Sequence, residues 1–520
     1  MTSSSTKVFG ILALLTAILL QVANLYFGEL NQDEGWYLYA AQQVTEGKLP
    51  YRDYAYTQAP LLPLVYSLTA PIVREWGVGG GRAVTAVLGL VAAFLASSIA
   101  RRLVKGEGSD VAGVIAFTLC AVNVYQSYFT TVVKTYSLCA CFLTAGVLAL
   151  VTARGTLRYC LAGTLLVLAG ATRISAGVAV PIVAIYLVAT DGWRLKARTW
   201  GFVTGACACA ALVFGPLYVM APEGFLFGVL EYHAGREAGG LLQTMVFKAG
   251  FVSRVVQAYF LTFTFLVFFT ITRLMKGREE GSPAVTIIWL VVATITLVHF
   301  VAPFPYDDYQ VVVYPLACAA VAATLAAHIS AADKTGKRAV VAMAGLWVLA
   351  TASSFSSPIN QDWMIAGRDR IWWRMKEKPA LAQLQDVGAW LRERTKPGDL
   401  LLTQDTYIAV EAGLRVPAGL EMGPFSYFPS LSDERAAALK VLNEASMRSL
   451  LEATPAQYAA LSGYALSLSS PEVSEVPESD RAALREIVDR RFEVERIVPR
   501  FGQAQTTLEL LRARGQAVAP

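Results

Sequence analysis

Two adjacent acidic residues, Asp33 and Glu34, follow the first long apolar run of the chain, within the segment NQDEGWY over 31–37. Ionisable groups at the edge of such a run are costly to leave unpaired, and a positioned carboxylate can act as a general base. Asp33 also stands where a helix would start, and an aspartate there commonly serves only as an N-cap. The residues alone leave both interpretations open. The apolar spacing over 35–46 predicts an amphipathic helix lying in a membrane interface.

Four basic side chains could stabilise negative charge near these acids. Lys134 and Arg173 stand at the ends of apolar runs, while His233 and Arg236 are three residues apart and would share one face of a helix. A reaction that expels a phosphate needs fixed cations or donors around the leaving group. We therefore predict phosphate binding by Arg173, His233, Arg236 and Lys134. The alternative, which suits Lys134 best, is that these side chains only extend to the lipid headgroups.

Two tyrosine-rich turns could recognise a polar substrate, one between the prolines of 50–63 and one over 303–309. Their candidate sugar-binding residues are Tyr54, Tyr56, Gln58, Tyr306, Asp307 and Asp308. The plain alternatives are an aromatic belt for the tyrosines and a solvated turn for the acids. One acidic dipeptide offers a hard cation too few oxygen ligands, and the seven cysteines form no Cys-x-x-Cys pair or Cys/His cluster. We therefore expect neither a metal nor a cofactor.

The elements that must position these residues follow from composition. The chain has 520 residues, of which 55% are hydrophobic and only 16% charged, with a net charge of +5 and a mean hydropathy of +0.47. The first 356 residues contain 41 charged side chains, whereas the last 164 contain 42. Soluble domains are about 25% charged, so only the second part has their composition. The sequence predicts a membrane domain over 1–356 and a soluble domain over 357–520.

Eleven apolar runs are candidates for membrane helices, although the runs at 159–172 and 175–190 are short for a bilayer about 30 Å thick. The runs are 8–27, 82–100, 110–128, 131–152, 159–172, 175–190, 199–219, 251–273, 284–302, 311–329 and 339–355. We interpret the first as an uncleaved span, because it is long for a signal peptide. Every second gap is rich in Lys and Arg, which marks the cytoplasmic side. The protein is thus expected in the cell inner (plasma) membrane, with its N-terminus in the cytoplasm and its C-terminal domain extracytoplasmic.

The C-terminal domain combines helical and strand-like patterns. Residues 380–394 have helical apolar spacing, 400–404 form an apolar run typical of a buried strand, helical patterns return at 433–453 and 480–490, and alternation occurs at 492–498. This mixture predicts a small α/β domain. The chain has no phosphate loop or nucleotide fingerprint, and its basic residues lie in short loops, which argues against an ATP-driven pump and against a nucleic-acid partner.

The Asp-Glu pair after the first span, the helix behind it and the turn ending in Pro60-Leu61 resemble the GT-C glycosyltransferases. The closest branch is glycosyltransferase family 39, with the protein O-mannosyltransferases and the aminoarabinose transferases. The resemblance implies transfer of a sugar from a polyprenyl-phosphate lipid to a lipid, glycan or protein acceptor at the outer face. It also implies that Asp33 is the general base and Glu34 its supporting partner. Where the family often has a second acid, over 130–135, this chain has Lys134.

Two other classes of function compete with an inverting, lipid-linked glycosyltransferase. A lipid or sugar transporter (flippase) would have internal repeats and charged residues near the bilayer midplane. The sequence shows no repeat, and its polar groups concentrate between the spans. A non-catalytic membrane scaffold would leave the Asp33-Glu34 pair with no role beyond helix capping.

Overall fold

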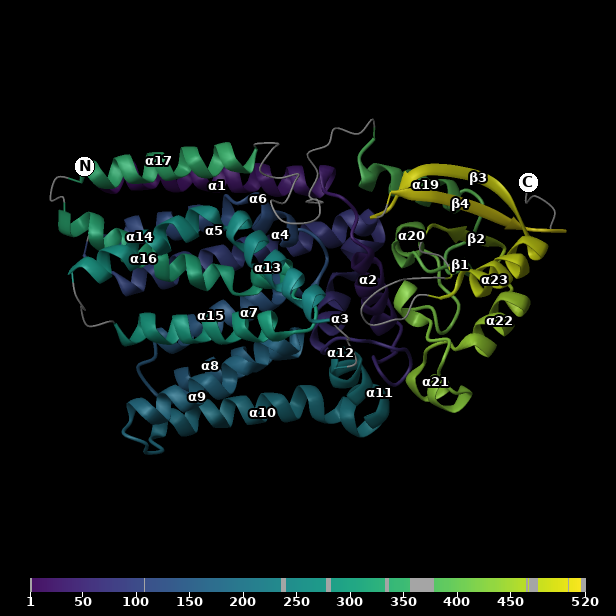
Figure 1. Ribbon diagram of the computed structural model, residues 1–520, viewed down its shortest axis with the longest axis horizontal. Coiled ribbons are helices and arrows are strands. Elements are labelled where there is room, and N and C mark those ends of the chain that lie inside the picture. Colours follow the sequence, from purple (N-terminus) through teal and green to yellow (C-terminus); the bar gives the residue numbers. More distant parts are fainter. Residues whose placement is uncertain are drawn as a thin grey trace.

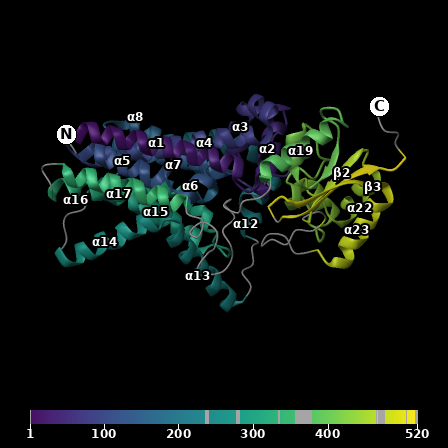
Figure 2. The same ribbon diagram turned by 90° about the horizontal axis from the view of Figure 1, so that it is seen from above.

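The computed structural model describes residues 2–106, 108–234, 240–276, 282–332, 336–355, 378–463, 466, 476–503 and 505–515. Residues 2–355 form a long bundle of helices, here called the helical body, and residues 378–515 form a mixed α/β part at one end of it (Figure 1). The N-terminus lies at the opposite end of the bundle. A second view, turned by 90°, shows the same separation, with α2 (Gln32–Thr45) between the two parts (Figure 2).

The helices of the body follow the apolar runs of the sequence. Besides α2 they are α1 (Thr2–Phe27), α3 (Leu61–Tyr66), α4 (Ala70–Leu103), α5 (Gly108–Ala121), α6 (Val124–Phe129), α7 (Thr135–Val151), α8 (Thr156–Thr172), α9 (Ala179–Thr190), α10 (Ala197–Met220), α11 (Pro222–Leu226), α12 (Tyr232–Ala234), α13 (Leu241–Ala258), α14 (Phe260–Lys276), α15 (Pro283–Val301), α16 (Tyr314–Ala332) and α17 (Lys337–Ser354). The chain is therefore a multi-pass helical membrane protein, as expected.

The number of complete crossings is smaller by helix length than the eleven runs suggest. In the described residues, five helices are long and apolar enough to cross a bilayer, or six if the pair α13 and α14, bent by 94°, counts as one span. Four shorter apolar helices complete the set: 108–121, 135–151, 156–172 and 174–190. Two of these, 156–172 and 174–190, correspond to the short runs on either side of Arg173. The second begins with a 3-10 turn, Ile174–Val178.

Helix α2 differs from the interfacial helix expected over 35–46. Its residues from Gly35 to Ala41 are all buried, and only the end of the helix, at the half-buried Gln42 and at Thr45 and Glu46, has the exposed polar side that the spacing predicts. The reason is that α20 (Thr406–Ala412) of the C-terminal part packs against it. Gly35 makes this approach possible, because a Cβ there would lie 2.3 Å from the backbone nitrogen of Tyr407.

The C-terminal part has a four-stranded sheet in the order β1-β2-β4-β3. Strands β1 (Leu401–Thr403) and β2 (Tyr458–Leu461) are parallel, with Leu402 opposite Ala459, whereas β4 (Thr506–Ala513) is antiparallel to both β2 and β3 (Phe492–Phe501). Its other helices are α19 (Ala380–Arg392), α21 (Asp433–Leu439), α22 (Glu444–Ala453) and α23 (Glu478–Arg491). The expected α/β content is confirmed, but the single helical pattern at 433–453 is two helices, interrupted where Lys440 adopts a left-handed conformation (φ 60°).

Two large apolar cores hold the molecule together. One lies within the helical body and joins α1, α4, α5, α7, α16 and their neighbours. The other is shared: it contains Trp36 and Tyr37 of α2 together with Leu384 of α19, Tyr407 of α20 and Leu510 of β4. Because burial of apolar surface is the main stabilising contribution, this shared core fixes α2 and its acidic residues against both parts.

Candidate functional site

The start of α2 places the two acidic residues in different environments. Asn31 is the N-cap: its side chain accepts a hydrogen bond from the Asp33 amide at 3.1 Å, and Glu34 accepts one from the Asn31 amide at 2.9 Å. This is a capping box, which satisfies amides that would otherwise lack partners. The interpretation of Asp33 as the N-cap is therefore wrong. Its carboxylate is available for contacts outside the helix.

Glu34 forms a fully buried ion pair with Arg82 of α4. Both side chains are 0% exposed, and the Arg82 Nη2 and Nε atoms lie 2.6 and 2.7 Å from the two carboxylate oxygens. Glu34 also accepts a hydrogen bond from the amide of Val133 at 3.2 Å, while Arg82 donates to the carbonyls of Leu25, Gly28 and Glu29. Glu34 thus anchors the start of α2. Arg82 was not among the predicted residues, although an arginine at the start of the apolar run 82–100 was a usable signal.

Asp33 belongs to a chain of alternating charges. The ammonium of Lys134 lies 3.0 Å from Asp33 and 3.2 Å from Asp308, and Tyr136 donates a hydrogen bond to the same Asp308 oxygen at 2.8 Å. The other Asp33 oxygen accepts a hydrogen bond from the Trp36 indole at 3.2 Å.

The 130–135 segment and the 306–309 turn therefore meet at α2. Where the resemblance suggested a missing second acid, the structure brings Asp308 to Asp33 from a distant part of the chain, with Lys134 between them. Asp33 retains 23% side-chain exposure, against 11% for Lys134 and 13% for Asp308. Asp33 is thus the most accessible member of this cluster. In the described part of the chain, no group of three or more His, Cys, Asp or Glu residues has the arrangement of a metal site.

Arg173 lies beside this cluster, with its guanidinium 4.0 Å from the ring centre of Tyr309 and 5.1 Å from that of Tyr136. Its Nη1 atom donates to Thr135 at 3.2 Å. Two buried polar atoms here lack a hydrogen-bond partner within the described residues: Nε of Arg173 and Oδ1 of Asp308. Buried polar atoms are nearly always paired, so an unpaired donor beside an unpaired acceptor indicates room for a polar ligand.

Asp307 contacts a second basic residue near the site, Arg254. It forms an ion pair with Arg254 of α13 at 2.6 Å and accepts a hydrogen bond from Tyr125. Arg254 was not among the predicted residues, although it is an ionisable residue inside the apolar run 251–273. Tyr306, in the same turn, is 39% exposed and packs on Tyr309.

The turn over 50–63 packs against α2. Tyr56 is buried against Trp36 and Tyr37, at ring distances of 5.5 and 6.4 Å, and its hydroxyl has no hydrogen-bond partner within the described structure. Tyr37, which the sequence analysis did not select, has its phenol in the electrostatic field of Asp33, Arg173 and Lys134. Tyr37 is therefore a further residue of the candidate site around Asp33.

The remaining predicted residues make contacts within that turn and its surroundings. The Tyr54 hydroxyl donates to the carbonyl of Ala40 at 3.2 Å, and the carbonyl of Gln58 accepts from Tyr51. His233 Nε2 lies 2.9 Å from the carbonyl of Thr57. These contacts hold the turn in place. Arg236 lies outside the described residues.

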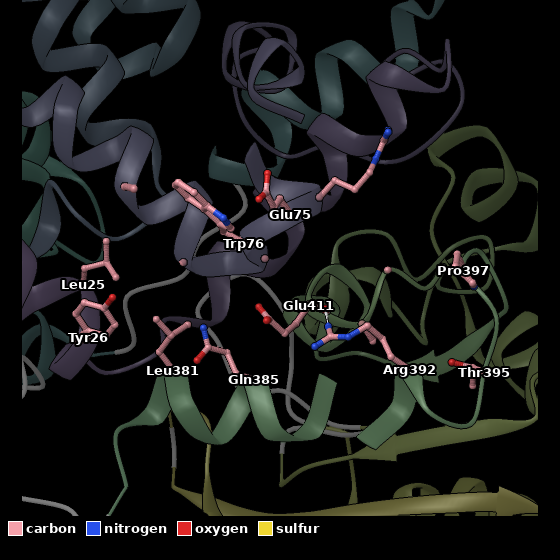
Figure 3. A pocket seen from close by; sticks show the side chains of 16 residues that line it. Leu25, Tyr26, Glu75, Trp76, Leu381, Gln385, Arg392, Thr395, Pro397 and Glu411 are labelled. Atoms are coloured by element: carbon pink, nitrogen blue, oxygen red, sulfur yellow. Dashed lines mark hydrogen bonds between the residues drawn. The ribbon is translucent and has the colours of Figure 1, made fainter. Parts of the chain in front are cut away.

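A cavity of about 1070 Å³ lies between α4 and the C-terminal part (Figure 3). Trp76 and Glu75 of α4 line one side, while Gln385 and Arg392 of α19 line the other. Glu411 of α20 also lines the cavity. It accepts a hydrogen bond from the Val78 amide at 2.9 Å, beside the kink in α4 where Gly77 has φ 57°. A Cβ at residue 77 would lie 2.0 Å from the Glu411 carboxylate. Glu411 therefore caps the segment of α4 that carries Arg82.

No protein-family model matches the chain, and no curated protein matches it in sequence. Solved structures match it over nearly its whole length. ArnT from Cupriavidus metallidurans bound to undecaprenyl phosphate has a TM-score of 0.59 at 13% identity, covering 98% of this chain and 99% of that one. Apo ArnT gives a TM-score of 0.60 at 14% identity, over 96% and 97%.

A second match is the archaeal oligosaccharyltransferase AglB from Archaeoglobus fulgidus, in complex with an inhibitory peptide and a dolichol-phosphate. Its TM-score is 0.50 at 13% identity, over 88% of this chain and 69% of that one. Both proteins are GT-C members, so the chain has the GT-C fold, with a mostly helical body and a small C-terminal sheet. The fold expected from the resemblance is confirmed.

Proposed function

We propose that this protein is a membrane glycosyltransferase that takes its sugar from a polyprenyl-phosphate lipid. The observation that carries the proposal is the cluster at α2: Lys134 joins a partly exposed Asp33 carboxylate to Asp308. Arg173 lies on the ring of Tyr136 in the same cluster, and its buried Nε has no acceptor among the described residues. Two proteins of the same fold were solved with lipid phosphates, undecaprenyl phosphate in ArnT and a dolichol-phosphate in AglB. An anionic phosphate is the kind of ligand that an unpaired guanidinium donor would accept.

In the proposed reaction, the acceptor hydroxyl transfers its proton to the Asp33 carboxylate as its oxygen attacks the anomeric carbon. The bond between that carbon and the phosphate oxygen breaks, and the electron pair leaves with the lipid phosphate. Attack from the face opposite the leaving group inverts the anomeric centre. Charge develops on the departing oxygen, where a fixed cation in a buried site has its greatest effect. We assign that role to Arg173, with Tyr309 and Tyr136 holding its guanidinium.

Lys134 has a different proposed role. Because its ammonium bridges Asp33 and Asp308, it offsets the charge of both carboxylates and occupies the position between two acids where a divalent cation would otherwise bind. Asp308 Oδ1, which is unpaired among the described residues, is then a candidate acceptor for a sugar hydroxyl. Asp307 is held by Arg254 and keeps the 306–309 turn in place.

We further propose that the site faces the outer side of the cell inner (plasma) membrane. The basic gaps, including Arg101, Arg154 and Arg194, alternate with gaps that carry the acids of the site, and positive charge favours the cytoplasmic side. The N-terminus would then be cytoplasmic, and residues 357–520 would form an extracytoplasmic domain covering the site of a membrane domain over 1–356. The acceptor is a lipid, glycan or protein hydroxyl.

A reconstitution experiment separates this proposal from a transporter. Purified protein in liposomes is given polyprenyl-phosphate mannose, labelled in the sugar, and a mixture of acceptor lipids and glycans from an inner-membrane extract. The proposal predicts a labelled acceptor together with free polyprenyl phosphate, with inversion at the anomeric carbon by NMR. Movement of intact labelled donor between leaflets, without release of polyprenyl phosphate from this or other sugar donors, would instead indicate a flippase.

A further inference from the structure

A second cavity lies at the opposite ends of the helices that carry the candidate site. It has a volume of about 750 Å³, is open on one side, and is bordered by the end of α4, the end of α7 and the start of α8. Small-molecule sites commonly have volumes of about 300–1,000 Å³. Lys134 and Arg173 stand at the other ends of α7 and α8, and the 17 residues of α8 span about 25 Å. The cavity is therefore separate from the candidate site.

The charged side chains that line this cavity are all basic, and the hydroxyls of Ser98 and Thr152 lie beside them. Arg102 comes from α4, and Arg154 and Arg158 flank the start of α8, while no acidic residue lines the cavity. Across the described ranges, no carboxylate pairs with these three arginines, in contrast to neighbouring Arg101, which pairs with Asp110. Gly155 precedes helix α8 and provides no side-chain cap, so the first amides and the dipole of the helix also favour an anion here.

The remaining wall is apolar. Leu148 of α7 and Leu161 and Leu165 of α8 line the cavity together with the arginines. Leu161 is 42% exposed, and Leu157, one turn nearer the start of the helix, is 82% exposed. In a membrane protein such exposed leucines contact acyl chains. A free inorganic anion would make no favourable contact with these leucines. A phospholipid can contact the arginines through its phosphate and the leucines through its acyl chains.

We propose that this cavity binds the phosphate headgroup of an anionic membrane lipid, with its acyl chains along the leucines of α7 and α8. Arg102, Arg154 and Arg158 surround the phosphate, and the first turn of α8 donates its amides. A cavity walled by three helices distinguishes this site from the general attraction of basic loops for a negatively charged leaflet, because its occupant needs space as well as charge.

The test uses the purified full-length protein in neutral detergent, with pyrene-labelled phosphatidylglycerol as the probe. Each of Arg154→Gln and Arg158→Gln is expected to weaken binding about fivefold, the effect of one basic residue on an anionic lipid. Arg194→Gln, in an exposed loop between α9 and α10, is the charge-matched control and should leave binding unchanged. An equal loss in this control would show diffuse attraction and overturn the site.

Two further measurements separate the headgroup from other occupants. Ala145→Phe adds volume inside the cavity without changing its charge, so it is expected to weaken phosphatidylglycerol binding as well; unchanged binding would contradict the proposal. Phosphatidylcholine and millimolar inorganic phosphate are expected to compete poorly with the probe. Displacement by inorganic phosphate at the concentration that phosphatidylglycerol requires would identify a site for free anions and overturn the lipid assignment.

Discussion

Replacing Glu34 with glutamine should destabilise the protein before it affects chemistry. The Glu34 carboxylate accepts two hydrogen bonds from Arg82, at 2.6 and 2.7 Å, and one each from the amides of Asn31 and Val133. Glutamine offers only one acceptor oxygen and leaves the fully buried Arg82 without a counter-charge. Breaking one side of a buried pair costs about 3–5 kcal/mol, so Glu34→Gln is expected to lower the unfolding free energy by that amount.

The assay is a double-mutant cycle followed by reversible unfolding in mixed micelles. Because Glu34→Gln/Arg82→Leu removes both charges, it should recover part of the stability lost in Glu34→Gln alone, which gives a coupling energy of about 1–3 kcal/mol. Asp33→Asn is the matched control, since its side chain is partly exposed and Lys134 keeps Asp308 as a partner. If Glu34→Gln unfolds like the wild type yet loses sugar transfer, the anchoring role is refuted and Glu34 acts in the chemistry.

Three further results follow from the structure. Glu411→Ala should lower the unfolding free energy by about 1–2 kcal/mol, because it uncaps Val78; equal stability in thermal unfolding would contradict that role. Burial raises the pKa of Glu421 from 4.5 to about 7, so the folded state binds the extra proton and stability should fall by about 3 kcal/mol as pH rises from about 4.5 to about 7. Glu421→Gln should flatten that profile, and an unchanged slope would show another group is responsible. Chelation with EDTA should leave sugar transfer intact, because Lys134 bridges the two acids; inhibition reversed by a divalent cation would contradict this assignment.

The sequence was most informative where a pattern is local. Apolar runs located the body helices, and the break at Arg173 identified the short helices on either side of it. The acidic pair was found because its position after an apolar run is unusual. Local patterns failed at α2, whose burial depends on α20, nearly 400 residues further along the chain.

The same limit applies to the site. Asp308 was selected for its chemistry, but its contact with Lys134 joins residues 174 positions apart, and no spacing rule predicts such a pair. Arg82 and Arg254 were not predicted, although Arg82 begins the apolar run 82–100 and Arg254 lies within the run 251–273. An ionisable residue in such a run was the available signal for both.

The most direct test of the account is sugar transfer by Asp33→Asn in liposomes containing a polyprenyl-phosphate sugar. General-base catalysis contributes about 10²–10⁴-fold, so kcat should fall at least a hundredfold while donor binding changes little. Asp53→Asn, which removes an exposed acid paired with Arg52 in the neighbouring turn, is the matched control and should retain wild-type transfer. Transfer by Asp33→Asn at a rate near that of the wild type would contradict the central claim.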